Sequence, residues 1–123
     1  MKEVFVKNIE KLTLKNSNFR KVLFTAKHMQ LVLMSIKVGS DIGMEVHKTV
    51  DQFIRVERGS GITILDNKKY KLSDGDAIVI PAGVVHNIIN VSKTEPLKLY
   101  TIYTPPNHKH GTIQKNKPLQ DEH

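Results

Sequence analysis

The chain has 123 residues, 39% of them hydrophobic and 25% charged, which is enough for one hydrophobic core and too little for two. It contains no cysteine, which excludes disulfides, thiolate nucleophiles and thiolate metal sites and leaves histidine, carboxylate and amide groups as metal ligands. The formal charge of +7 comes from lysines scattered from Lys2 to Lys117 and not from a basic patch with interleaved aromatics, so we expect no nucleic-acid partner.

The sequence predicts neither a membrane span nor a signal peptide. No apolar run approaches the roughly 18 to 20 residues that cross a bilayer. The start of the chain, Met1–Glu3, leads into no signal-peptide core. We therefore expect a cytoplasmic protein with no membrane partner.

The first third of the chain shows short β-type runs and no sustained helical period. The runs are Val4–Val6, Val22–Thr25 and Met29–Ile36, separated by polar breaks. Met29–Ile36 is almost entirely apolar, which predicts a strand covered by the core on one face and by a second subunit on the other. Gln30 is a polar exception that either points into the cavity or caps the end of the strand.

Two strands are expected next, over Ile42–Lys48 and Gln52–Arg58. Glu45 and His47 are two residues apart in the first of them, so their side chains share a face. A hairpin with a symmetric loop pairs His47 with Gln52, and opposed side chains in an antiparallel pair also share a face. The three polar side chains are therefore expected to converge.

The stretch GDAIVIPAGVVHNIIN, residues 75–90, combines a turn, a strand and a histidine. Ala77–Ile80 is an apolar run rich in β-branched residues, which predicts a buried strand that ends at Pro81. Gly83 permits a positive φ in the tight corner that follows. The next strand then begins with His86.

The remaining segments also predict β-structure. Ile62–Leu65 and Lys69–Leu72 flank a hairpin turn, and Leu97–Tyr103 alternates as a strand does. His108–His110 carries two histidines with no third ligand nearby, and this segment is interpreted as a solvated loop.

The stretch over residues 75–90 resembles the second sequence motif of the cupin family. Its spacing, G-(five)-P-x-G-(two)-H-(three)-N, matches that motif at all five fixed positions. The resemblance to the family spans about residues 29–106 and is to small single-domain bacterial cupins.

The first cupin motif, G-(five)-H-x-H-(three or four)-E-(six)-G, is matched with two departures. Gly39, His47 and Gly59 fall on their fixed positions, with a four-residue spacer. Glu45 stands where the family usually has its first histidine, and Gln52 stands where it usually has glutamate. The set of side chains therefore keeps one negative charge.

The resemblance implies an all-β fold, the double-stranded β-helix or jelly-roll barrel, with little or no helix. It implies a single cupin domain over residues 1–123. The barrel core is expected at about residues 20–104, followed by a polar C-terminal tail at 105–123.

The resemblance also implies a metal site inside the barrel, formed by Glu45, His47, Gln52 and His86. Two imidazoles and one carboxylate suit Fe(II) and also Mn(II), Co(II), Ni(II) or Zn(II), so the identity of the divalent transition metal stays open. Gln52 either binds the metal weakly through its carbonyl oxygen or donates a hydrogen bond to Glu45.

The expected function is that of a metal-binding cupin, an oxygenase-type or isomerase-type enzyme acting on a small molecule in the cavity. One alternative is a non-catalytic module that binds a small ligand or a metal. Another is a metal-free barrel resembling sugar isomerases and epimerases, with a histidine as base and Tyr100 or Tyr103 as acid. We also expect a homodimer, because the strand at Met29–Ile36 needs cover on two faces.

Overall fold

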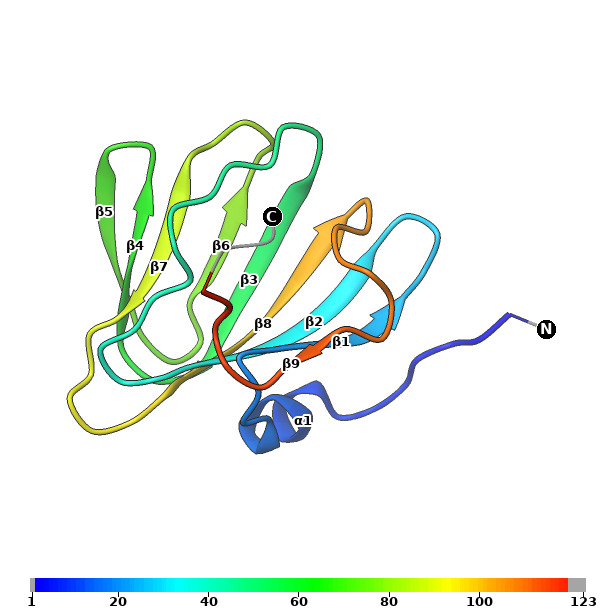
Figure 1. The fold of residues 1–123 in the computed structure, drawn as a ribbon, viewed down its shortest axis with the longest axis horizontal. Helices are drawn as coiled ribbons and strands as arrows, with labels where there is room; N and C mark the ends of the chain where they lie inside the picture. The colour runs from blue at the N-terminus through cyan, green and yellow to red at the C-terminus, as the bar shows by residue number, and fades with distance from the viewer. Residues whose placement is uncertain (1, 120–123) are drawn as a thin grey trace.

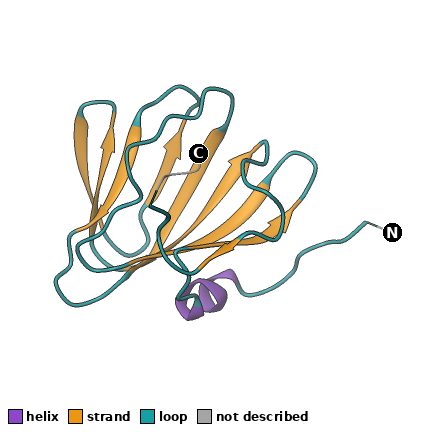
Figure 2. Ribbon diagram, in the orientation of Figure 1, coloured by secondary structure: helices purple, strands orange, loops and turns teal. Residues whose placement is uncertain are grey.

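The computed structural model describes residues 2–119 and consists mainly of β-strands. Within these residues there are nine strands in two antiparallel sheets and one short helix at their side (Figure 2). The elements in chain order are α1 Ile9–Lys15, β1 Arg20–Thr25, β2 Gln30–Ile36, β3 Asp51–Arg58, β4 Gly61–Leu65, β5 Lys68–Leu72, β6 Ala77–Ile80, β7 His86–Asn90, β8 Leu97–Thr104 and β9 Ile113–Gln114. The predicted all-β jelly-roll fold is confirmed.

The two sheets face each other and enclose the core between them (Figure 1). One sheet has the strand order β6-β3-β8-β2-β1-β9 and the other has the order β5-β4-β7. On β8 every second residue from Leu97 to Tyr103 is buried, as expected when one face of a strand packs on a core. The core combines side chains of both sheets, including Val32, Ile54 and Ile88.

The segment Ile42–Lys48 is not the regular strand that the sequence predicts. It runs beside β7 and contacts it through isolated bridges, one of which joins Glu45 to His86 (Figure 1). Gly43 has a φ of 103°, a conformation that interrupts a regular strand. The segment is therefore extended but irregular.

The predicted hairpin pairing of His47 with Gln52 is wrong. Strand β3 is hydrogen bonded to β6 on one edge and to β8 on the other, which places Gln52 between Ile80 and Tyr103. A strand has only two edges, so no edge of β3 is left for the segment that carries His47.

The N-terminal segment contains a helix instead of the expected β-type run. Val4–Val6 forms no strand, and α1 follows it with Asn8 as its N-cap, whose side-chain oxygen accepts a 2.9 Å hydrogen bond from the backbone N–H of Lys11. The helix packs against β8, β3 and β2, and Lys98 of β8 donates a hydrogen bond to the carbonyl of Asn16 at the helix end. Seven residues are too few for a periodic signal, which explains why the sequence did not reveal α1.

Strand β6 is exposed on one face, contrary to the prediction of a buried strand. Ile78 and Ile80 are buried, whereas the side chain of Val79 is 68% exposed. The reason is position, since β6 lies at the edge of the larger sheet. Strand composition alone does not distinguish an edge strand from a central one.

Gln30 faces the barrel interior at the start of β2 and is fully buried. Its carbonyl oxygen accepts hydrogen bonds from the backbone N–H groups of Asn107 (3.1 Å) and His108 (2.9 Å). Its amide nitrogen donates to the His108 carbonyl (2.7 Å) and to Thr25 Oγ1 (3.0 Å). Gln30 therefore both points into the cavity and caps the end of the strand, as the two alternatives predicted. Its hydrogen bonds hold His108 in a half-buried position, where the centroid of the His108 ring is 5.1 Å from that of the Tyr103 ring. The solvated-loop interpretation is wrong for this histidine.

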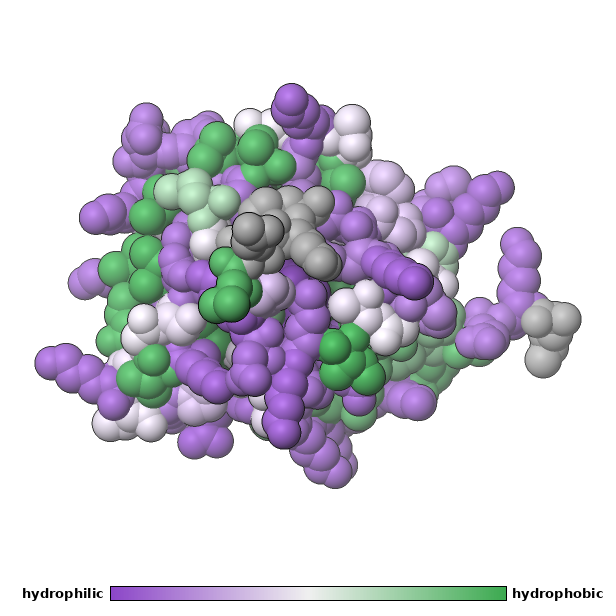
Figure 3. Space-filling view, viewed as in Figure 1, coloured by the Kyte–Doolittle hydropathy of each residue, from purple (hydrophilic) through white to green (hydrophobic). Residues whose placement is uncertain are grey.

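The segment after β8 contributes β9, which pairs with β1 at the far edge of the larger sheet. Residues 120–123 of the expected polar tail lie outside the described residues. Hydrophilic side chains cover most of the face seen in Figure 3, with hydrophobic ones interspersed. No helix in the described part of the chain has the length and hydrophobicity needed to cross a lipid bilayer.

Candidate metal centre

Glu45 and His86 are placed side by side by the backbone. The N–H of Glu45 donates to the carbonyl of His86, and the N–H of His86 donates to the carbonyl of Glu45, both at 2.8 Å. Side chains of two residues paired in this way lie on the same face. Both side chains are buried, with exposed fractions of 4% for Glu45 and 3% for His86.

His47 joins them from the same extended segment. It lies two residues after Glu45 and is buried, whereas Val46 between them is exposed. Its carbonyl accepts a 2.8 Å hydrogen bond from the N–H of Gly83. Gly83 has a φ of 91°, as its place in the predicted corner requires, and a Cβ there would meet nothing within 4 Å. The glycine is therefore needed for its backbone conformation and not for space.

The three side chains converge on one point. One ligand atom from each of Glu45, His47 and His86 lies within 4.8 Å of those of the other two. His47 Nε2 is 3.8 Å from Glu45 Oε2, and the two imidazole centroids are 5.4 Å apart. This is the one such group of three or more acidic or histidine side chains found among residues 2–119.

The ring of His86 is oriented by the chain just before it. Its Nδ1 lies 3.0 Å from the carbonyl oxygen of Val84, and because a carbonyl can only accept, Nδ1 carries the proton. In the neutral ring, Nε2 is then the nitrogen that can accept a bond. It is buried and has no hydrogen-bond partner in the described structure. A fixed imidazole with one free nitrogen is the form that binds a metal.

Gln52 lies at the edge of the same interior space. Its amide nitrogen donates a 3.0 Å hydrogen bond to Thr101 Oγ1. Its carbonyl oxygen is buried and accepts no hydrogen bond from any described residue. Of the two predicted roles, this arrangement favours a weak ligand through the carbonyl oxygen.

Tyr103 also borders the cluster, and the sequence suggested it only as one of two candidate acids. Its ring lies edge-on to that of His47, with centroids 5.7 Å apart. Burial raises the pKa of the Tyr103 hydroxyl well above its ordinary value, and the charge of Glu45 raises it further. The other candidate, Tyr100, is on the outer face of the sheet with its ring 6.3 Å from that of Phe53, so that alternative is wrong.

A polar network that the sequence did not reveal holds the irregular segment in place. Asn87 Nδ2 donates to Asp41 Oδ2 at 2.9 Å, and Asn87 Oδ1 accepts a 2.9 Å hydrogen bond from the N–H of Gly43. Asp41 is also paired with Lys117 at 2.6 Å. Asn87 lies between His86 and Asn90, at a position that the second motif leaves variable, so the motif did not identify it as a candidate residue.

Asn90, the last fixed position of that motif, has a structural role. Its amide nitrogen donates to the carbonyl oxygens of Ile36 (2.9 Å) and Glu95 (3.0 Å). Its own oxygen accepts a 2.8 Å hydrogen bond from the N–H of Ser92. Asn90 thus ties the end of β7 to β2 and to the loop that follows.

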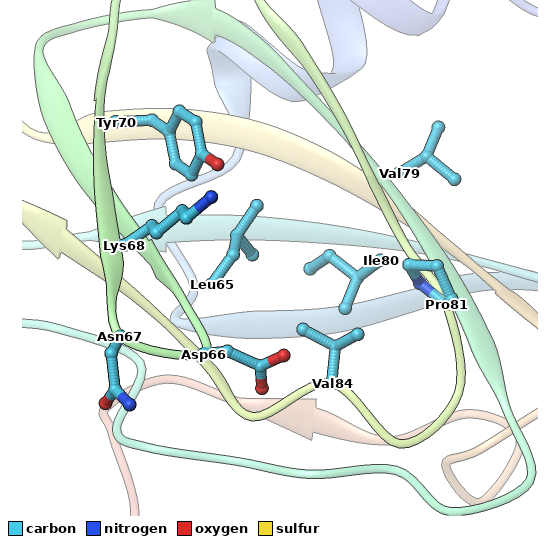
Figure 4. Close-up of a pocket in the computed structure, with 9 residues that line it drawn as sticks. All are labelled: Leu65, Asp66, Asn67, Lys68, Tyr70, Val79, Ile80, Pro81 and Val84. Atoms are coloured by element: carbon cyan, nitrogen blue, oxygen red, sulfur yellow. The ribbon is translucent and has the colours of Figure 1, made fainter.

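A cleft of about 490 Å³ opens next to the cluster, between β4–β5 and the end of β6 (Figure 4). The side chains of Leu65, Ile80 and Val84 lie at its centre. Two of the residues that line the cleft are strand partners of residues in the polar cluster. Leu65 is paired with His86, and Ile80 is paired with Gln52. The cleft is therefore a surface depression beside residues that flank the cluster.

The donor set fits a divalent metal. Burying a carboxylate beside two imidazoles costs free energy unless a cation or hydrogen bonds compensate the charge. A divalent ion held by Glu45, His47 and His86 would compensate it and would use the free Nε2 of His86. Two histidines and one carboxylate are also a known ligand set for non-haem Fe(II).

Comparison with known proteins agrees with the sequence motifs. The family model described as "Cupin domain" matches residues 32–103. The uncharacterized protein YrkC of Bacillus subtilis is 50% identical over 119 residues, which cover 92% of this chain and 63% of YrkC. The uncharacterized protein L612 of Acanthamoeba polyphaga mimivirus is 47% identical over 119 residues, which cover 94% of this chain and 74% of L612. This chain therefore spans less than two thirds of the length of YrkC.

The fold is shared with a solved structure. The crystal structure of BH2720 from Bacillus halodurans superimposes with a TM-score of 0.91 at 48% identity, covering 94% of this chain and 91% of that one. Its backbone and that of this chain thus follow the same path over nearly their whole length.

Proposed function

This chain belongs to the cupin family, and we propose that it is a metal-dependent member of that family acting on a small molecule inside its barrel. The observation that carries the proposal is the convergence of Glu45, His47 and His86, with a buried ring nitrogen on His86 that has no hydrogen-bond partner among the described residues. Three protein ligands leave coordination positions open for a substrate. The same set suits iron, manganese, cobalt, nickel and zinc.

In this proposal the side chains around the cavity have separate roles in binding the metal and the substrate. Glu45, His47 and His86 hold the ion, and Gln52 lies at its edge with its carbonyl oxygen available. A bound divalent metal would supply Lewis-acid polarisation of a ligand and, if redox-active, oxygen chemistry. Burial and the charge of Glu45 raise the pKa of Tyr103, so its hydroxyl stays protonated at neutral pH and is available as a proton donor and not as a base.

An oxygenase-type or isomerase-type reaction fits this arrangement. The second candidate is a metal-free isomerase-like or epimerase-like barrel with His47 as base and Tyr103 as acid, which the edge-on contact between these rings favours. A bound metal without turnover would instead indicate a binding module. Oxygen uptake and isomer analysis with small phenols, thiols and sugars would separate the enzymatic candidates.

The decisive test is the metal content of protein purified without a tag. We expect about one divalent transition metal per chain, and we expect His86→Ala to lose about 100-fold in metal affinity because it removes a ligand. His28→Ala is the matched control, since His28 is exposed and outside the cluster. Circular dichroism would show whether both variants keep the barrel fold. Equal metal content in His86→Ala and the wild type would refute His86 as a ligand.

We also propose that the protein is a homodimer. One apolar row crosses the outer face of the larger sheet, made by side chains paired in register: Val79, Phe53, Ile102, Leu31 and Phe24. An uninterrupted apolar row of this kind on an outer face supports a protein contact. A cytoplasmic location stays a prediction, which cell fractionation would test.

A further inference from the structure

Arg20 is buried inside the barrel without a carboxylate beside it. It is 1% exposed and is the one lysine or arginine among the buried residues of the described chain. It is paired with Met34, a core residue, so its side chain starts from the inner face of β1. Within residues 2–119 no acidic oxygen lies within 4.0 Å of its guanidinium. A buried cation without a counter-ion costs free energy.

One edge of the guanidinium has no hydrogen-bond partner among residues 2–119. Nη1 donates a 2.5 Å hydrogen bond to Gln114 Oε1, and the group lies 5.1 Å from the centroid of the Phe19 ring. Nε is buried and has no hydrogen-bond partner. Nη2 makes no hydrogen bond to any described residue either. The N–H groups of Nε and Nη2 point the same way, at a spacing that matches the two oxygens of a carboxylate.

The charge of the interior also favours an anion. Glu45 is the one carboxylate residue among the buried described residues. Arg20 and Glu45 are thus two buried residues of opposite formal charge that make no direct ion pair. A divalent ion bound at Glu45 would leave one positive charge uncompensated there, and Arg20 would add a second. An interior of this charge attracts an anionic ligand, and low-dielectric surroundings strengthen the attraction.

Arg20 and the proposed metal centre act on a common neighbour. The pKa of Tyr103 is raised by burial and by Glu45 and is lowered by Arg20, so its hydroxyl lies within electrostatic range of both charged groups. Tyr103 is itself in edge-on contact with His47, which places this common neighbour beside the proposed metal centre.

We propose that Arg20 is the binding residue for the carboxylate of a small organic acid, which enters the barrel beside the metal centre. The carboxylate accepts two parallel hydrogen bonds from Nε and Nη2, while Gln114 fixes the guanidinium through Nη1. The part of the inference that makes this acid the metal-site substrate rests on the proposed function. The carboxylate site itself requires only Arg20 and its support by Gln114.

The test is a titration of the Arg20 Nε–H signal in the 15N spectrum of the wild-type chain. The signal is assigned by its absence in Arg20→Lys. Acetate and benzoate are added to metal-free protein and to Zn(II)-loaded protein, with sodium chloride at equal ionic strength as the blank and phosphate as a tetrahedral anion. We expect a saturable shift with both carboxylates, weaker binding of phosphate, and tighter carboxylate binding when zinc is present.

Substitutions then locate the site. Arg20→Gln is expected to weaken benzoate binding about tenfold or more, because one partner of a charged hydrogen-bonded pair is removed. Arg55→Gln is the matched control, since Arg55 lies on the outer face beside Glu57 and its substitution removes the same charge. If Arg20→Gln fails to fold, Arg20→Lys replaces it. If neither folds, the Nε–H signal is assigned by through-bond correlation to the Arg20 backbone, and the wild-type titration decides.

A wild-type Arg20 signal that no carboxylate moves would overturn the inference, as would equal losses in Arg20→Gln and Arg55→Gln or tighter binding of phosphate than of carboxylate. Retained carboxylate binding in a chain that binds no metal would refute the proposed metal centre alone. The two proposals are therefore separable.

Discussion

The side chains at the proposed metal centre carry a single negative charge because Glu45 is acidic and Gln52 is neutral. Gln52 is paired with Tyr103 on the inner face, and its amide nitrogen is engaged by Thr101. An acid in its place would keep nearly the same shape but would add a charge next to the cluster. The substitution therefore separates a metal site from an empty polar pocket.

We expect Gln52→Glu to fold with metal bound and to depend on the metal more than the wild type does. Without metal, two buried carboxylates repel each other and the pKa of one is raised, which at neutral pH costs about 1 to 3 kcal/mol. With a divalent ion, both charges are compensated. Thermal unfolding with and without EDTA should show a larger chelator effect in Gln52→Glu.

Asn67→Asp provides the control for this experiment, because it adds the same charge at an exposed position. Its response to EDTA should equal that of the wild type. An equal chelator effect in Gln52→Glu and the wild type, or no effect in either, contradicts a metal site with Gln52 at its edge.

At the scale of elements, the segment that carries Glu45 is held by side chains more than by a regular ladder. Asp41 accepts hydrogen bonds from Asn87 and Lys117, which come from β7 and from the chain after β9. Burial alone would raise the pKa of Asp41, but these two donors and the charge of Lys117 bring it below its ordinary value of 3.8. Ionised Asp41 is thus favoured by folding.

The sign of the resulting pH dependence follows from this lowered pKa. The stabilisation by Asp41 is present in full above its ordinary pKa and is lost as pH falls through the lower folded value. We expect Asp41→Asn to be less stable than the wild type at pH 7 by at most about 1 kcal/mol, since the pair is partly exposed. The difference should shrink below about pH 3.

Thermal unfolding of Asp41→Asn and of the wild type at pH 7 and pH 3 measures this difference in stability. Lys117→Met is the matched variant, because it removes the other partner and should show the same loss at pH 7. A stability difference between Asp41→Asn and the wild type that is unchanged between the two pH values would show that Asp41 acts through its shape and not its charge.

At the scale of the whole molecule, the outer face of the larger sheet is divided in two. Helix α1 packs against β8, β3 and β2, so it covers part of this face. Another part carries the apolar row that runs from Val79 of β6 to Phe24 of β1. In the proposed homodimer, a second subunit would cover only the area that α1 leaves open.

We expect light scattering to give twice the 14.0 kDa mass of one chain at micromolar concentration. Val79→Lys places a charge in the apolar row and should convert the protein to monomers without unfolding it, because Val79 is 68% exposed. Val91→Lys is the control, at an exposed valine outside the row. A wild-type mass of one chain would rule out the homodimer.

The sequence by itself determined the parts of this protein that depend on neighbouring residues. The corner at Gly83 takes its positive φ, the hairpin of β4 and β5 forms where the turn residues stand, and β8 alternates as predicted. These features follow from local backbone preferences and from the two-residue repeat of a strand, which are visible in a short window. The candidate residues Glu45, His47, Gln52 and His86 were also named from spacing and family resemblance.

Only the tertiary structure decided how these residues meet. The sequence favoured a local hairpin that joins His47 to Gln52, whereas the fold pairs Glu45 with His86 and gives both edges of β3 to strands from later in the chain. It also turned Tyr103 inward and buried Arg20 without a carboxylate partner. Such contacts join residues far apart in the chain, and their partners are selected by burial and edge pairing across the whole barrel, which no local pattern encodes.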